Sequence, residues 1–203
     1  MNGTENWLDL PVTNAISGLE FKSLAVDVGA NVGSWSIPLT KLFDNVVAFE
    51  PDERNFDLIP TAENLTVVKA AVSGFTGETP FFLRETSCHN SLLPEHPIGG
   101  EGKQEVTVIE ELQVPCITLD DSCEDGADFV KMDIEGGEVI ALRGCLDAGR
   151  WSRTIFLVEC HDTYSDVEAE LVRLGKTVTK IAHPLGGSHP LHCWALGVPD
   201  AGV

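Results

Sequence analysis

The amino-acid sequence predicts a doubly wound α/β fold, in which a mostly parallel sheet is covered by helices on both faces. Short runs of apolar and β-branched residues alternate with segments whose apolar residues recur at helical spacing, and this alternation is typical of βαβ units. A glycine-rich turn follows the first apolar run, as in many folds of this class. The 203 residues suffice for one hydrophobic core and are few for two. We therefore expect residues 1–203 to form one domain.

Five of the apolar runs are short and bounded by polar or turn residues, so we expect them to be buried parallel strands. They comprise residues 24–28, 46–49, 65–68, 129–132 and 155–158. Helical spacing is found in residues 35–43, 54–63, 138–146 and 166–174. Because crossovers between parallel strands are right-handed, these units predict a doubly wound sheet. Two last strands are expected at 178–181 and 193–198, joined by the loop 183–192.

Residues 79–116 break this rhythm. They contain Pro, Gly and His together with short alternating stretches. We expect an irregular insertion with a hairpin, and long insertions of this kind often carry function. This insertion is the candidate cover for a substrate.

The charge balance is strongly acidic. The chain has 13 Lys and Arg against 32 Asp and Glu, a formal net charge of −19. A phosphate backbone would be repelled at long range, and no basic run could neutralise several phosphates. Nucleic acid is therefore not expected as a partner, whereas the acidity discriminates poorly among small acceptors. The sequence does not indicate the oligomeric state.

The hydropathy of the chain indicates no membrane span. No window reaches about 18 consecutive apolar residues, and the first ten residues lack the basic and apolar regions of a signal peptide. We expect a cytoplasmic location, in which the cysteines stay reduced and are mostly buried. The six cysteines are Cys88, Cys116, Cys123, Cys145, Cys160 and Cys193.

The glycine turn predicts a ligand site. Residues 25–34 read AVDVGANVGS, an apolar strand followed by a turn whose backbone N–H groups can approach a ligand at the start of a helix. Gly29, Asn31 and Gly33 form this turn. Asn31 stands where a dinucleotide fingerprint has the second glycine, which admits a pyrophosphate, and this counts against NAD. Glu50 lies 21 residues after Gly29, where an acid can accept hydrogen bonds from ribose hydroxyls, so S-adenosylmethionine (SAM) fits this pattern best.

Acidic residues and a histidine follow two neighbouring strands of the predicted sheet. Asp133 and Glu135 come after one strand, and Glu159 and His161 end the next. Because alternate residues of a strand point the same way, Glu159 and His161 should lie beside the first two acids. A histidine with a pKa near neutral can act as a general base. We predict His161 as the base, with Asp133 as second choice; a structural His161, or helix capping by Asp133 or Glu135, is the alternative.

Two groups of side chains are of the types that bind metal ions. Asp133, Glu135, Glu159 and His161 could hold a divalent cation that orients the acceptor oxygen, but we do not predict a metal. His183, His189, His192 and Cys193 are close in sequence, yet their spacing fits no closed zinc pattern. We expect them in a loop, which lines the acceptor pocket if the preceding strand is parallel.

Several motifs together resemble the FkbM family of SAM-dependent methyltransferases. They occur in the family's order and cover residues 23–162. The motifs are DVGANVG (27–33), AFEPD (48–52), KAAVSGFTGETPFF (69–82), NSL (90–92), VPCITLDD (114–121), KMDIEGGE (131–138) and VECH (158–161).

The resemblance implies a Rossmann-like class I methyltransferase fold with seven strands, the last of them antiparallel. It also implies that Asp27 lies near the methionine end of SAM and Glu50 on its ribose. By the same resemblance Ala71 and Val72 lie close to the adenine, and Asp133 and Glu135 beside the reacting methyl group. Members of the family methylate hydroxyl groups of sugars and polyketides, so the implied acceptor is a small molecule or a glycan.

The leading hypothesis is thus a SAM-dependent O-methyltransferase. One alternative is a SAM-binding or partner-binding protein without catalytic activity. The other is an NAD-dependent oxidoreductase, which the G-x-N-x-G turn disfavours. Hydrolase and kinase functions are not indicated, because the sequence has no GxSxG elbow and no P-loop.

Overall fold

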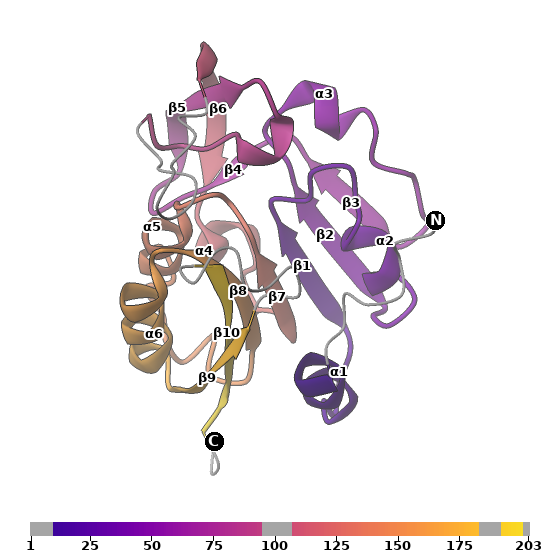
Figure 1. The fold of residues 1–203 in the computed structure, drawn as a ribbon. Helices are drawn as coiled ribbons and strands as arrows, with labels where there is room; N and C mark the ends of the chain where they lie inside the picture. Colours follow the sequence, from indigo (N-terminus) through magenta and orange to yellow (C-terminus); the bar gives the residue numbers. More distant parts are fainter. Residues whose placement is uncertain (1–9, 95–106, 183–191, 201–203) are drawn as a thin grey trace.

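A seven-stranded sheet forms the centre of the computed structural model, which describes residues 10–94, 107–182 and 192–200. The strands lie in the order β3-β2-β1-β7-β8-β10-β9 (Figure 1). They are β1 (Leu24–Val28), β2 (Asn45–Phe49), β3 (Leu65–Val68), β7 (Phe129–Met132), β8 (Ile155–His161), β9 (Lys176–Ala182) and β10 (His192–Pro199). β10 is antiparallel to both of its neighbours, and the other pairs in this sheet are parallel. The predicted doubly wound, mostly parallel sheet is confirmed.

The strand order reverses at the centre of this sheet, where β1 and β7 pair directly. From β1 the chain continues to β2 and β3 on one side, whereas β8, β10 and β9 extend the sheet on the other side of β7. In an open α/β sheet such a reversal leaves a crevice at the carboxyl ends of the two central strands. The sheet therefore provides a binding position beyond Val28 and Met132.

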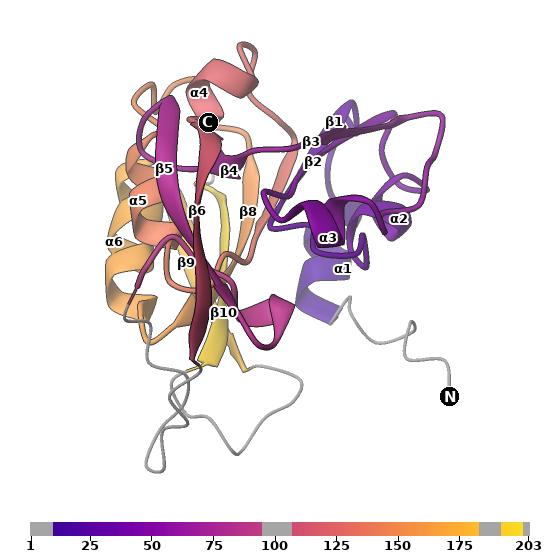
Figure 2. The same ribbon diagram turned by 90° about the horizontal axis from the view of Figure 1, so that it is seen from above.

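Helices cover both faces of the large sheet. Side chains of β1 and β7 alternate between the faces: Val26 and Met132 pack in one buried cluster with residues of α5 and α6, whereas Ala25 and Phe129 pack in another with residues of α1 and α2. Figure 2 shows α5 and α6 on one side of the strands and α1 on the other. The helices are α1 (Leu10–Ser17), α2 (Ser36–Leu39), α3 (Glu53–Phe56), α4 (Leu119–Ser122), α5 (Glu138–Arg143) and α6 (Tyr164–Arg173).

Two predicted helices are wrong in length. The segments 35–43 and 54–63 each contain only a four-residue α-helix and continue as turns. After α2 the N–H of Lys41 donates to the carbonyl of Pro38, three residues back, and a proline at 60 prevents α3 from continuing. In contrast, β8 extends beyond the apolar run 155–158 to His161, the residue predicted to end this strand, and β10 pairs with it as far as His161.

A second, three-stranded sheet contains much of the predicted insertion. It consists of β4 (Ala71–Val72), β6 (Val108–Ile117) and β5 (Gly77–Arg84), in that order. β5 and β6 pair antiparallel along their length, so the expected hairpin is present and the segment is more regular than predicted; residues 95–106 lie outside the described part. In Figure 1 the small sheet lies at the end of the large sheet toward which β1 and β2 point.

The described residues also bear on the membrane and cysteine predictions. No helix among them is long and apolar enough to cross a membrane. Five cysteines are buried and free, as predicted, and the side chain of Cys88 lies outside the description.

Replacement of Gly29 by alanine tests the close contact between the loops after β1 and β7. A Cβ atom on Gly29 would lie 1.9 Å from the carbonyl oxygen of Asp133, at a φ of +77°. We expect Gly29→Ala to lower the free energy of unfolding by about 3 kcal/mol or more, because steric overlap adds to the backbone strain. Gly175→Ala is the matched control, since Gly175 has a φ of +73° and no atom within 4 Å of the added Cβ. It should cost about 1–2 kcal/mol in the same urea titration; equal losses would contradict the close contact.

Candidate functional site

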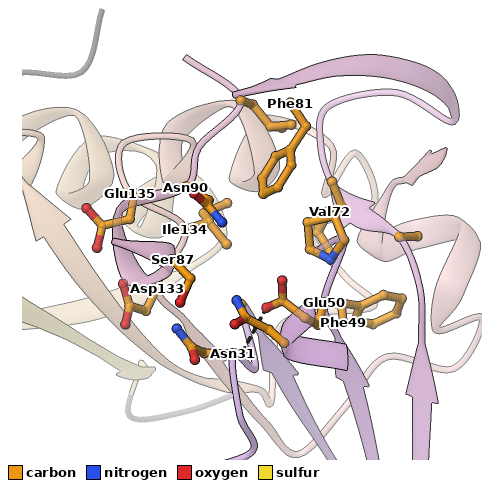
Figure 3. Close-up of a pocket in the computed structure, with 16 residues that line it drawn as sticks. Asn31, Phe49, Glu50, Val72, Phe81, Ser87, Asn90, Asp133, Ile134 and Glu135 are labelled. Carbon is orange, nitrogen blue, oxygen red and sulfur yellow. Dashed lines mark hydrogen bonds between the residues drawn. The ribbon is translucent and has the colours of Figure 1, made fainter. Parts of the chain in front are cut away.

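A cavity lies at the carboxyl ends of β1, β2 and β7, under the small sheet. It has about 660 Å³ of empty space, part of it open to solvent. Figure 3 shows an apolar end with Phe49, Val72 and Phe81, and an acidic end with Asp133 and Glu135. The cavity is therefore chemically different at its two ends.

The glycine turn forms part of the cavity wall. The N–H groups of Gly29 and Ala30 donate to the carbonyl of Phe49, at 3.1 and 3.0 Å, which holds the turn against the end of β2. Gly29 and Asn31 line the cavity, and both have positive φ. Gly33 is not among the lining residues; it packs against Ile59, whose Cγ2 would be 3.0 Å from an added Cβ.

Glu50 is a buried carboxylate that faces the cavity. It is 5% exposed, and its two oxygens accept hydrogen bonds from the N–H groups of Asn31 and Asp52, both at 2.8 Å. Burial raises the pKa of Glu50 to about 7, although these backbone N–H groups act in the opposite direction. A ligand that donates hydroxyl hydrogen bonds here would favour the ionised form of Glu50.

Ala71 and Val72 form β4 and line the apolar end of the cavity. Both are buried, and Phe49 and Phe81 lie beside them in the wall (Figure 3). An aromatic ring system without charge suits such surroundings. These two residues, predicted from the family resemblance, thus lie where a flat heterocycle would fit.

Asp27 lies beneath the cavity and does not line it. It is fully buried and accepts a hydrogen bond from the Ser36 hydroxyl at 2.6 Å. Its other oxygen is 3.2 Å from Nζ of Lys131, which also donates to the carbonyl of Gly29 at 2.9 Å and lies 3.9 Å from Asp133. Lys131 is therefore a paired structural residue, and Asp27 acts on the glycine turn through it.

The predicted cluster at the ends of β7 and β8 is present, with His161 at its centre. Nε2 of His161 lies 3.5 Å from Glu135 and 3.9 Å from both Asp133 and Glu159. Nδ1 is 3.1 Å from Oε1 of Glu138, a fully buried residue. Asp133 and Glu135 line the cavity, whereas His161 is not among the lining residues.

Glu138 is a residue that the sequence interpretation missed. Its Oε1 accepts hydrogen bonds from the N–H groups of Ile134 and Gly136 at 3.3 and 3.0 Å. Glu138 thereby accepts hydrogen bonds from the backbone N–H groups that precede α5. The sequence analysis considered this capping role for Asp133 or Glu135. An acid in the first turn of a helix is the available signal, because its side chain can reach back to preceding N–H groups.

The environment of His161 favours its charged form. Burial alone lowers the pKa of His161, but hydrogen bonds and charge interactions with Glu135 and Glu138 outweigh it and raise the pKa to about 12. Burial also raises the pKa of Glu135, against the opposing effect of His161. An imidazolium cannot accept a proton, so these surroundings do not provide the near-neutral base that the sequence suggested.

Asp133, Glu159 and His161 are the described residues that could hold a metal ion. One ligand atom from each lies within 4.8 Å of the others, and Glu138 fixes the imidazole from behind, as second-shell carboxylates do. A divalent cation would have to displace the proton on Nε2, which competes for the same position. The sequence analysis also considered a second group of residues for zinc. In this group Cys193 packs in the core, while the side chains of His183, His189 and His192 lie outside the described residues.

The sequence interpretation also missed the residues that close the cavity from the side of β5. Ser87, Asn90 and Leu92 line it; Asn90 and Leu92 belong to the NSL motif, whose role the sequence did not indicate.

Comparisons with known proteins agree with this geometry. The sequence profile of the methyltransferase FkbM domain matches residues 27–178, and no curated protein matches the chain. The solved methyltransferase FkbM from Methylobacillus flagellatus KT is 19% identical, with a TM-score of 0.58 over 89% of this chain. This chain spans 45% of the length of that protein.

Two other solved structures are similar in fold. Precorrin-6y C5,15-methyltransferase from Geobacter metallireducens GS-15 is 15% identical, with a TM-score of 0.53, 97% of this chain and 92% of that chain covered. Magnesium protoporphyrin IX methyltransferase from Synechocystis PCC 6803, solved with bound SAM, is 12% identical, with a TM-score of 0.50, 94% of this chain and 78% of that chain covered. The sheet is thus that of a class I methyltransferase, and because the family profile covers most of the sequence, the chain belongs to the FkbM family of methyltransferases.

Proposed function

We propose that the chain binds SAM in this cavity and transfers its methyl group to a hydroxyl of a sugar, a polyketide or another small metabolite. The observation that carries the proposal is a single cavity with a buried carboxylate, Glu50, between an apolar end and an acidic end. The two ends match the two ends of SAM, an adenine ring and a cationic sulfonium. SAM in the Synechocystis neighbour supports the same cofactor.

The residues present fit SAM better than a dinucleotide. Glu50 can accept hydrogen bonds from the ribose hydroxyls, and Ala71 and Val72 leave an apolar surface for the adenine. Asn31 carries a side chain where the second glycine of a dinucleotide fingerprint lets the pyrophosphate approach. This argues against the NAD-dependent alternative.

When bound, SAM supplies an electrophilic methyl group on a sulfonium. The chain's own task is then to align an acceptor oxygen with that group and to exclude water, which contributes most to such reactions. We assign the acceptor hydroxyl to Asp133, because its side chain is 30% exposed and lines the cavity. As a hydrogen-bond acceptor Asp133 can orient the hydroxyl and take its proton, with a smaller contribution to the rate.

His161 then serves to fix the acids, and Asp133 replaces it as our candidate base. A charged His161 lies among Asp133, Glu135 and Glu159, and it reduces their mutual repulsion in a buried place. A neutral hydroxyl acceptor suits this acidic end, because a negatively charged group on the acceptor would be repelled.

Calorimetric titration with S-adenosylhomocysteine, the product form of the cofactor, tests the proposal. NADH is titrated in parallel, each with and without Mg²⁺. We expect micromolar binding of S-adenosylhomocysteine and no binding of NADH. Binding of NADH alone would favour the oxidoreductase, and a dependence on Mg²⁺ would favour the metal site at Asp133, Glu159 and His161. If S-adenosylhomocysteine binds but no hydroxyl acceptor in a broad screen is methylated, the alternative of an inactive SAM-binding protein gains support.

The affinity for S-adenosylhomocysteine should depend on pH through Glu50. The pKa of Glu50 is raised to about 7 and the ribose hydroxyls favour the ionised carboxylate, so binding should be strongest above pH 7. Below pH 7 the affinity should fall by up to about tenfold per pH unit, with proton release on binding. Glu50→Gln should weaken binding and remove this dependence. The control is Glu53→Gln, whose exposed side chain pairs with Lys69; a wild-type affinity that does not change between pH 5.5 and 8.5 would contradict the role of Glu50.

His161→Gln should show a loss of stability that shrinks as the pH rises. The folded-state pKa of His161, about 12, lies above the unfolded value of about 6.5. Its contribution is therefore fully present below pH 6.5 and is lost as the pH rises toward 12. We expect a deficit of about 3 kcal/mol at pH 6 in urea unfolding, and a smaller one at pH 10. His89→Gln is the control, because burial lowers the pKa of His89 and its effect should not change above pH 7; a constant deficit for His161→Gln would argue that His161 is neutral.

A further inference from the structure

Residues 85–94, which we call the strap, run along the wall of the cavity between its two functional ends. The strap follows β5 and contains a short 3-10 helix, Ser87–His89. The backbones of Phe82 and Ser91 pair across its base, and Ser87, Asn90 and Leu92 line the cavity. Figure 3 shows Ser87 and Asn90 on the same side of the cavity as Glu135.

The buried side chain of Arg84 holds the strap in shape. Arg84 is 1% exposed, and its guanidinium donates to the carbonyls of His89 at 2.8 Å and Leu93 at 2.7 Å. Its backbone N–H donates to Oδ1 of Asn90 at 2.7 Å. Hydrogen bonds from a charged donor are the stronger ones, so the side chain of Arg84 fixes the path of the strap. The backbone N–H of the same residue fixes the position of the Asn90 amide.

The Asn90 amide is connected to Glu50 through Asp52. Nδ2 of Asn90 donates to Oδ2 of Asp52 at 2.7 Å, and the backbone N–H of Asp52 donates to Oε1 of Glu50 at 2.8 Å. Asp52 is 1% exposed and caps α3. Without Asn90 the buried carboxylate of Asp52 would lose a hydrogen-bond donor. The turn at Asp52, whose backbone N–H donates to Glu50, would then be less constrained.

We propose that Asn90 is a positioning residue for the cofactor site: it fixes the turn at Asp52 that holds the Glu50 carboxylate, and Arg84 holds Asn90 in place. The proposal rests on the proposed function in one respect, that the ligand of Glu50 is the ribose of SAM. A second hydrogen bond holds the strap at the acidic end of the cavity, where the Ser91 hydroxyl donates to the carbonyl of Glu135 at 2.7 Å. One segment thus connects the ribose carboxylate with the acids beside the reacting group.

A double-mutant cycle between Asn90 and Glu50 tests this connection. S-adenosylhomocysteine is titrated calorimetrically into the wild type, Asn90→Ala, Glu50→Gln and the double variant. We expect Asn90→Ala to weaken binding about tenfold, the usual effect of one buried hydrogen bond to a charged group. In the Glu50→Gln background the same change should cost less than about threefold, because Asn90 acts through Glu50. Wild-type affinity in Asn90→Ala, or equal losses in both backgrounds, would overturn the proposal.

Two further variants separate positioning from folding. Asn64→Ala removes an amide that donates to two carbonyls, of Thr40 and Phe43, away from the cavity, so it should lower stability and leave binding unchanged. Asn90→Asp keeps the acceptor for Arg84 but replaces the donor to Asp52 with an oxygen. Because the new carboxylate would also repel that of Asp52, Asn90→Asp should weaken binding at least as much as Asn90→Ala. Wild-type affinity in Asn90→Asp would overturn the proposal.

A readout without ligand distinguishes this proposal from the proposed function. Carboxyl carbon NMR of glutamate-labelled protein follows the titration of Glu50 in the free wild type and in Asn90→Ala. We expect a higher pKa of Glu50 in the variant, because a loosened N–H bond from Asp52 favours the ionised form less. An unchanged pKa of Glu50 would count against Asn90 as a positioning residue. If the pKa rises but the wild type does not bind S-adenosylhomocysteine, the positioning role stands and the proposed cofactor fails.

Discussion

The buried ammonium of Lys131 is the contact on which the site depends. It lies between Asp27 and Asp133 and donates to the carbonyl of Gly29, so it joins the loops that follow the two central strands. Burial alone would lower the pKa of Lys131, but the charges of the two aspartates outweigh it and keep the group protonated. The same convergence brings the carbonyl of Asp133 onto Gly29, leaving no room for a side chain there. The glycine turn and the acidic end of the cavity are thus positioned by one cation.

A second buried cation, His161, organises the acidic end from the opposite side. Its ring is fixed by Glu138, whose oxygen also satisfies two backbone donors before α5. Asp133 lies between the two cations and is the acid with the most exposed side chain among the partners of His161. The positive charges on both sides, each 3.9 Å away, hold the Asp133 carboxylate in a fixed orientation. Alignment of the acceptor, which depends on geometry, should therefore matter more to the rate than proton removal.

The sequence predicted the strands well because their signal is local. The bounds of β1, β3 and β7 agree with the apolar runs, since a buried parallel strand must be apolar on both faces. Glu50, Ala71, Val72 and Asp133, which the sequence analysis selected as site residues, all line the cavity, and their roles stay predictions. In contrast, the apolar run 155–158 stops before the end of β8, which pairs with β10, a strand more than 30 residues later in the chain, as far as His161. The apolar pattern alone does not mark such an end, although the sequence analysis placed Glu159 and His161 there.

The positions of the predicted site residues outside the cavity wall have a related physical cause. Asp27 and Gly33 belong to the family motif, yet one lies under the turn against Lys131 and the other packs against Ile59; a motif identifies residues that the site needs without telling which of them face the ligand. The charge state of His161 is set by Glu135 and Glu138, more than 20 residues earlier in the chain. The position of Glu50 is held through Asp52 by Asn90, 38 residues beyond Asp52. In both cases the group that a motif supplies is tuned by a partner from another element. Roles that depend on such partners, the proton on His161 and the fixed carboxylate of Glu50, require the fold before they can be assigned.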